Sequence, residues 1–224
     1  MKNPAKFWDN TAKKYSLKPV PNELIEDSSA VAAVLNPLTE ADWINAATKV
    51  LVDENVRGIR IDALCTKLGV TKGSFYWHFK SRQELLTALL AGWRKRMTTK
   101  VIERLTALGS NPSERLRALF ELPHRAKSPE FARVELSIRD WGRKAELAQE
   151  AVKEVDQLRL NYFKTLLKQH GLSDELAEKR AYIAYSIMMG DSILRVTLEG
   201  EVPADSVTDE VMKLLTQDAV NHEP

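Results

Sequence analysis

The residues best suited to chemistry in this 224-residue chain lie between positions 71 and 80. Their side chains carry hydroxyls, an indole, an imidazole and two ammonium groups, all of which donate hydrogen bonds. Such donors bind phosphate oxygens, and the same groups contact base edges in a DNA groove. The segment therefore favours nucleic-acid binding through Thr71, Lys72, Ser74, Tyr76, Trp77, His78 and Lys80.

These donors need a short helix on an apolar support. Thr71 is suited to begin a helix through about Phe79, with Val70, Phe75 and Phe79 on its buried side. Gly73 costs about 1 kcal/mol relative to alanine inside a helix. A close approach of the backbone to DNA would explain that cost, so Gly73 joins the candidate DNA-binding residues.

A second short helix is expected just before this one, over about residues 60–68, with Gly69 supplying the left-handed residue at its end. Two short helices joined by such a turn have the layout of a helix-turn-helix, whose second helix lies in the major groove. Upstream, a first helix is expected between Thr39, a good N-cap, and Gly58.

The rest of the chain has helical periodicity. Ser81 and Glu84 form the capping pattern S-R-Q-E of a helix that continues to about Leu108. Further helices are predicted near 113–126, 129–143, 145–169, 173–199 and 205–219, with Gly and Pro at the breaks. The expected fold class is all-α, with about nine helices. The first 37 residues, which contain four prolines, are interpreted as an N-terminal arm.

Charge is distributed unevenly along the chain. Residues 38–96 hold ten Lys/Arg against six Asp/Glu, whereas residues 97–224 hold eighteen against twenty-one. A basic head joined to a mildly acidic body suits phosphate binding by the head. We therefore predict an arm at 1–37, a helix-turn-helix DNA-binding domain at 38–85, and a separate helical body at 86–224.

The stretch LGVTKGSFYWHFKSRQELL, from Leu68 to Leu86, resembles the signature of the TetR family of transcriptional regulators. The resemblance implies a homodimer that represses transcription at palindromic double-stranded DNA and is released by a small-molecule inducer. It also implies two kinds of DNA contact. The role of Trp77 is not decided by the resemblance: its side chain could pack in the core or contact DNA. Base edges or nearby backbone are approached by Thr71, Lys72 and Ser74, and phosphate backbone by Tyr76, His78 and Lys80.

The start of the first motif helix departs from the family. A serine or threonine usually caps that helix and contacts a phosphate, but here the sequence is Arg60-Ile61-Asp62. The Asp62 side chain is able to cap the helix, and Arg60 is able to replace the hydroxyl contact with a charged one. Arg60 therefore joins the candidate DNA-binding residues, while Cys65 is interpreted as a small packing residue.

The resemblance implies that this body, residues 86–224, is a ligand-binding and dimerisation domain with a site for the inducer. Two half-sites are read together, so a dimer is expected. Its candidate interface residues are Ile183, Ile187, Gly190, Leu194, Val211 and Leu214. The candidate ligand-binding residues are Trp93, Met97, Phe120, His124, Trp141, Tyr162, Met188 and Asp191. Packing inside one chain is the alternative for both sets, and Asp191 is also placed to pair with Arg195 one turn along.

Other function classes have little support. One cysteine and four histidines offer little for a metal site, and no cofactor-binding or catalytic motif occurs, so neither a cofactor nor an enzyme is expected. About 20 residues of the arm are similar to the start of some methyltransferases but include none of their chemistry. No apolar run could span a membrane and no signal peptide is present, so a cytoplasmic location is expected. A helical interaction protein without sequence-specific DNA binding remains the alternative.

Overall fold

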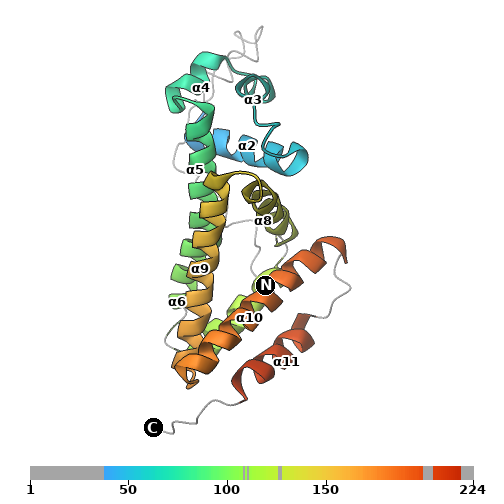
Figure 1. Cartoon of the computed structure of the whole chain (residues 1–224). Helices are drawn as coiled ribbons and strands as arrows, with labels where there is room; N and C mark the ends of the chain where they lie inside the picture. The colour runs from blue at the N-terminus through green and yellow to red at the C-terminus, as the bar shows by residue number, and fades with distance from the viewer. Residues whose placement is uncertain (1–37, 108, 110, 126–127, 199–203, 218–224) are drawn as a thin grey trace, which may run out of the picture. The chain divides into compact units, whose positions relative to one another are not determined.

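Every regular element in the described part of the chain is a helix (Figure 1). The computed structural model describes residues 38–107, 109, 111–125, 128–198 and 204–217, and no β-strand occurs within these ranges. The predicted all-α fold class is therefore confirmed. The arm predicted at 1–37 lies outside the described residues.

The head comprises α2 (Glu40–Glu54), α3 (Ile61–Leu68), α4 (Lys72–His78) and the start of α5 (Arg82–Arg94). The two short helices of the predicted motif, α3 and α4, are separated by a tight turn. Gly69 adopts φ 67° there, the left-handed conformation expected at the end of α3.

The helix caps largely follow the sequence signals. Thr39 and Asp42 form a full capping box, in which the backbone N–H of Thr39 donates to Asp42 Oδ2 at 2.8 Å. The end of α2 was predicted wrongly at Gly58. The helix stops at Glu54, because Asn55 takes a positive φ of 71°, which asparagine tolerates better than most residues.

One long helical segment connects the head to the body. It consists of α5, a π-turn (η4, Lys95–Thr99) and α6 (Lys100–Thr106), so its predicted length is confirmed. The sequence did not indicate the π-turn, in which the N–H of Lys100 bonds to the carbonyl of Lys95, five residues earlier.

The body contains the remaining helices, and Figure 1 shows α9 running beside α5 and crossing α10. A helix was predicted near 113–126, but α7 stops at Phe120 and Pro123 lies in a single 3-10 turn, because proline cannot donate the next helical bond. The elements are α7 (Pro112–Phe120), η5 (Leu122–His124), α8 (Ser128–Gly142), α9 (Glu146–Gln169), α10 (Asp174–Thr197) and α11 (Ala204–Thr216).

Two apolar clusters hold these helices together. The first joins the head to α8 and the start of α9 and includes Trp43, Phe75 and Ile138. The second joins α7, α9, α10 and α11 around Leu116 and Phe163. Helix α4 therefore rests on a core that continues into the body.

Candidate nucleic-acid interface and the buried polar network

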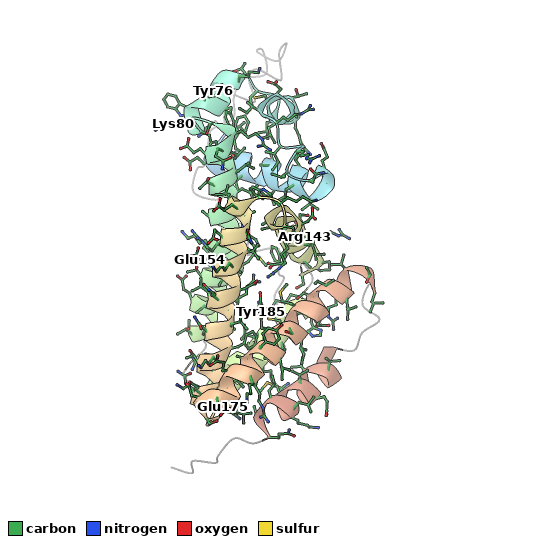
Figure 2. All side chains as sticks on the ribbon, in the orientation of Figure 1. Tyr76, Lys80, Arg143, Glu154, Glu175 and Tyr185 are labelled. Atoms are coloured by element: carbon green, nitrogen blue, oxygen red, sulfur yellow. The ribbon has the colours of Figure 1, made fainter. Side chains whose placement is uncertain are left out.

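Helix α4 has one buried side and one exposed side. Phe75 and Phe79 are buried, as predicted, and the ring of Phe75 meets that of Trp43 edge-on at a centroid distance of 5.2 Å. On the other side Tyr76 is exposed, and Trp77 is 86% exposed. Figure 2 shows Tyr76 and Lys80 at the outer side of the head. Trp77 therefore does not pack into the core of the described residues, and its exposed indole is accessible to a partner.

The start of α4 presents donors that its own backbone does not use. Thr71 is the N-cap residue, but its side chain makes no capping hydrogen bond. A Cβ added at Gly73 would meet only the Thr71 hydroxyl, at 3.5 Å, an ordinary contact. Packing within the described residues therefore does not require glycine here, which fits the predicted approach of another molecule. Ser74 and His78 are partly buried beside these groups.

Asp62 does not cap α3, although the sequence suggested that its side chain could. The N-cap residue is Arg60, which makes no side-chain capping bond, and Asp62 lies inside the helix. The Asp62 carboxylate instead pairs with the ammonium of Lys72, at 2.6 Å, and this hydrogen bond raises the pKa of Lys72. Arg60 is exposed, as a phosphate contact would require. Cys65 is buried, and burial raises the pKa of its thiol, which suits a packing role.

Two basic residues after α4 have different surroundings. The backbone N–H of Lys80 donates to Glu84 Oε2 at 2.6 Å, so Glu84 completes the cap of α5 one residue earlier than the pattern S-R-Q-E predicts. The Lys80 side chain is exposed. Arg82, in contrast, donates to the carbonyls of Ile59 and Val56, both at 2.5 Å. Arg82 therefore holds the loop before α3, while Lys80 remains available to a partner.

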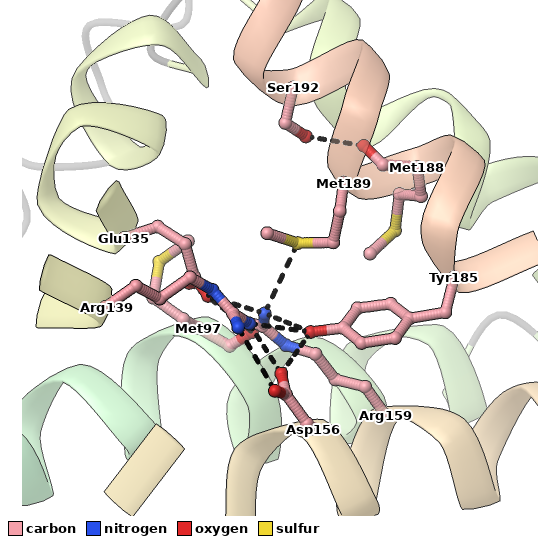
Figure 3. Close-up of polar contacts among 9 residues, drawn as sticks. All are labelled: Met97, Glu135, Arg139, Asp156, Arg159, Tyr185, Met188, Met189 and Ser192. Carbon is pink, nitrogen blue, oxygen red and sulfur yellow. Dashed lines mark hydrogen bonds and ion pairs between the residues drawn. The ribbon is translucent and has the colours of Figure 1, made fainter. Parts of the chain in front are cut away.

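A buried network of charged side chains lies where α8, α9 and α10 meet (Figure 3). Arg159 donates to both carboxylate oxygens of Glu135, at 3.1 Å each, and these side chains are only 10% and 6% exposed. Arg139 donates to both oxygens of Asp156, at 3.1 and 2.5 Å. The Tyr185 hydroxyl accepts from both arginines and donates to Asp156 at 2.6 Å. Two positive and two negative groups thus compensate one another.

The contacts within the network shift the pKa values of Asp156 and Tyr185. Burial alone would raise the pKa of Asp156, but the hydrogen bonds from Arg139 and Tyr185 outweigh it, and the pKa is lowered. Burial is also the main cause that raises the pKa of Tyr185 to about 12, helped by its bond to Asp156 and opposed by the charge of Arg159. At neutral pH the network therefore contains an ionised Asp156 and a neutral Tyr185.

The network also contacts the helix that leads to the head. Arg159 donates to the carbonyl oxygen of Met97, inside the π-turn, at 3.3 Å. One guanidinium thus joins α8, through Glu135, to the π-turn and to Tyr185 of α10. Helices are often distorted locally where a side chain hydrogen-bonds to a backbone carbonyl of the helix.

Apart from Met97, none of these residues was predicted from the sequence as a functional residue, although a signal existed. Arg159 falls on the apolar stripe of α9 between Val155 and Phe163, and Glu135 falls between Ala132 and Ile138 on α8. A charge on an apolar helix stripe indicates a buried ion pair, since a lone buried charge would be too costly.

The eight predicted ligand-binding residues do not form one cluster. Trp93 and Trp141 belong to the first apolar core, and Phe120 and Met188 to the second. His124 Nε2 lies 3.4 Å from Asp191, which also pairs with Arg195, as its spacing suggested. Within the described residues, three of the eight hold a buried polar atom without a hydrogen-bond partner. These atoms are Trp93 Nε1, His124 Nδ1 and the Tyr162 hydroxyl.

The predicted dimer-interface residues divide between the surface and the core. Ile183, Leu194 and Leu214 are exposed, and Leu194 is 53% exposed. Ile187 and Gly190 are partly buried. Val211 is buried against its own chain, because α11 directs Val211 and Leu215 into the second core. Its assignment to an exposed interface was therefore wrong.

Membrane-spanning helices and metal sites are both absent from the described ranges. None of the helices there is long and apolar enough to span a membrane. Nor do those residues include three or more His, Cys, Asp or Glu side chains grouped so that they could hold a metal ion.

Comparison with known sequences identifies the head. The sequence model of the bacterial regulatory proteins of the tetR family matches residues 44–89. The HTH-type transcriptional regulator SrpR of Pseudomonas putida is 44% identical over 48 residues. That match covers 21% of this chain and 22% of SrpR, so the chain spans about a fifth of the length of this relative.

Comparison with solved structures extends the likeness in fold to the body. The fatty acid degradation regulator FadR from Bacillus halodurans has a TM-score of 0.63 at 17% identity, over 82% of this chain and 97% of that chain. The regulator FadR from Bacillus subtilis, solved with stearoyl-CoA, has a TM-score of 0.59 at 17% identity, over 80% and 98%. The matched family and both of these structures are described as regulators.

Proposed function

We propose that this chain is a TetR-type transcriptional regulator that binds specific DNA through α4, because residues 44–89 match the model of that family. The observation that carries the proposal is the two-sided α4, with buried phenylalanines and exposed donors. The proposal includes a head at residues 38–85 and a body at 86–224. Its DNA contacts are Arg60, Thr71, Lys72, Gly73, Ser74, Tyr76, Trp77, His78 and Lys80.

Selection from random duplex DNA, followed by affinity measurement over a range of salt, tests this function. Selected DNA should bind more tightly than random DNA, and affinity should fall steeply with salt as counterions are released. Lys80→Ala should weaken binding to all sequences alike and reduce the salt slope by about one. Lys153→Ala, at an exposed lysine of α9, is the matched control and should change neither. Salt-independent binding, or none, would contradict the proposal.

We propose further that the protein acts as a homodimer on a palindromic site. The exposed apolar side chains of α10 and α11, among them Ile183, Leu194 and Leu214, support an interface with a second copy. Leu194→Asp should convert the dimer to a monomer in sedimentation velocity and weaken DNA binding. Leu158→Asp, at an exposed leucine of α9, should leave the dimer intact. A Leu194→Asp protein that remains dimeric would exclude this face.

We propose that the protein is a repressor released by a small molecule bound in the body. The support is the fold shared with a FadR solved with stearoyl-CoA, and the unpartnered polar atoms of Trp93, His124 and Tyr162. A metabolite screen that includes stearoyl-CoA, read as release of labelled DNA, tests this role. Tyr162→Phe should weaken the response of a released complex without loss of stability, whereas Tyr182→Phe on the surface should not. A response that is the same in both variants would exclude Tyr162.

A further inference from the structure

The side chains of α3 and α4 meet in one exposed ion pair. Lys72, the first residue of α4, lies 2.6 Å from Asp62 in the first turn of α3, measured from Nζ to Oδ1. The two side chains are 63% and 73% exposed. Exposed ion pairs contribute little to stability. The need to hold two helices together therefore does not explain this pair.

The position of Asp62 is also unfavourable for simple phosphate binding. Between Lys67 and Arg96 the sequence has seven basic residues and one acidic residue, Glu84. Asp62 adds a carboxylate directly against the first residue of the helix proposed to enter DNA. A phosphate would repel that carboxylate, and the pairing occupies the ammonium that a phosphate would attract. The pair is better suited to a partner that offers both a donor and an acceptor.

A G·C base pair offers that combination in the major groove. Guanine presents O6 and N7 as adjacent acceptors, and cytosine presents the N4 amino group as a donor. Since O6 and N4 are hydrogen-bonded to each other, they lie about 2.9 Å apart. This spacing is close to that of the ammonium and carboxylate in the protein. An A·T pair also places a donor beside an acceptor, but its amino group separates the acceptors N7 and O4, so the ammonium can reach only one of them.

The surroundings of the pair allow a base edge to approach. Gly73 follows Lys72 and has no side chain, and a shallow pocket of about 390 Å³ opens beside the pair between α3 and the turn. Besides the two charged residues, its lining includes Thr66, Gly69 and Thr71.

We propose that Asp62 and Lys72 together read a single G·C pair in each half-site, with Lys72 donating to guanine and Asp62 accepting from the cytosine amino group. The inference rests on the proposed function, in which α4 enters the major groove. It adds Asp62, which is outside the DNA contacts assigned above, and it assigns a base preference to one position.

The test is to select binding sites from random duplex DNA with the wild type and two variants. The wild type should prefer G·C at one position of each half-site by about 5- to 150-fold, the range for a good side-chain pairing. Asp62→Asn should reduce that preference and leave the other positions unchanged. Lys72→Gln should change the preferred base from guanine to adenine, because a glutamine amide pairs with adenine N6 and N7. Both changes are on the surface, so folding should be retained.

The outcomes separate this inference from the proposed function. If both variants select the wild-type site, or if the position that changes is A·T in the wild type, the inference is wrong while DNA binding stands. If the wild type selects no sequence at any salt concentration, the proposed function itself fails. Lys80→Ala is the matched control, since a lost phosphate contact should weaken all sequences alike and alter no base preference.

Discussion

The head and the body use the same kinds of polar side chain in opposite ways. On α4, Tyr76, Trp77 and nearby Lys80 project from the head and are largely exposed to solvent. In the body, Arg159 and Tyr185 are buried, and other side chains satisfy their polar atoms. Exposed donors keep their hydrogen-bonding capacity for a partner, whereas saturated ones fix the positions of helices. Residue type alone therefore does not separate a binding surface from a structural network.

Arg159→Met tests this contrast with the largest expected effect. The variant leaves the carboxylate of Glu135 buried without its main partner, which should reduce the free energy of unfolding by about 3–5 kcal/mol. Urea denaturation measures the loss. Arg143→Ala, at an exposed arginine of the surface, should stay within about 0.5 kcal/mol of wild type. If both arginine variants are equally stable, the body network has no structural role.

The double variant Arg159→Met, Glu135→Leu tests whether the unpaired carboxylate causes the loss of stability. Replacing a buried ion pair by apolar groups of similar size is often neutral or stabilising. Stability should therefore return towards wild type, although Arg139 loses its bond to Glu135. A double variant that is less stable than Arg159→Met would show that the unpaired carboxylate of Glu135 is not the cause of the loss.

Tyr185→Phe should have an intermediate effect. The change removes one hydroxyl that bonds to Arg139, Arg159 and Asp156, so a loss of about 1.5–3 kcal/mol is expected. DNA affinity of the folded protein should remain the same, because the hydroxyl belongs to the body. Tyr76→Phe on α4 should show the reverse pattern, with stability unchanged and binding weakened. Equal effects of the two changes on stability would remove the distinction between the regions.

Trp77→Ala should affect binding more than folding. An indole that is 86% exposed contributes little to the core, so the free energy of unfolding should change by less than about 0.5 kcal/mol. Loss of one hydrogen bond to DNA should weaken binding by about two- to tenfold. Fluorescence anisotropy with labelled DNA gives the affinity, and Leu136→Ala on α8 serves as the control. A marked drop in melting temperature for Trp77→Ala would contradict the exposed position of the ring.

The smallest expected effect concerns the pH dependence of the free energy of unfolding, which changes when Asp156 is replaced. Because the folded-state pKa of Asp156 is below its ordinary value of 3.8, its ionisation stabilises the folded protein above that value. This contribution is lost as the pH falls through the lowered pKa. Asp156→Asn should therefore make the stability less dependent on pH below about 4, relative to wild type. Asp53→Asn, at an exposed position of α2, should leave the acid dependence as it is in wild type.

The head was more predictable from the sequence than the body. The Thr39 N-cap, the left-handed Gly69 and the inward Phe75 depend on local sequence, and all three were predicted correctly. The contact between Asp62 and Lys72 was missed, because it depends on how two helices pack across the turn.

The body was harder to predict because its decisive contacts join distant helices. Glu135 and Arg139 are four residues apart, a spacing that usually indicates an exposed pair on one helix. Their burial follows from the packing of α8 against α9 and α10, which no single helix pattern reveals. Val211 was misplaced for the same reason, since its stripe could face either the core or a partner.

The π-turn has a consequence for exchanging heads between related regulators. Each residue turns an α-helix by about 100°, so a five-residue turn inserted into a helix changes the rotational phase of everything that follows. The bond from Arg159 to the carbonyl of Met97 ties this turn to the body. A chimaera that keeps this body should therefore be joined before Lys95, so that the graft retains the turn and its arginine together.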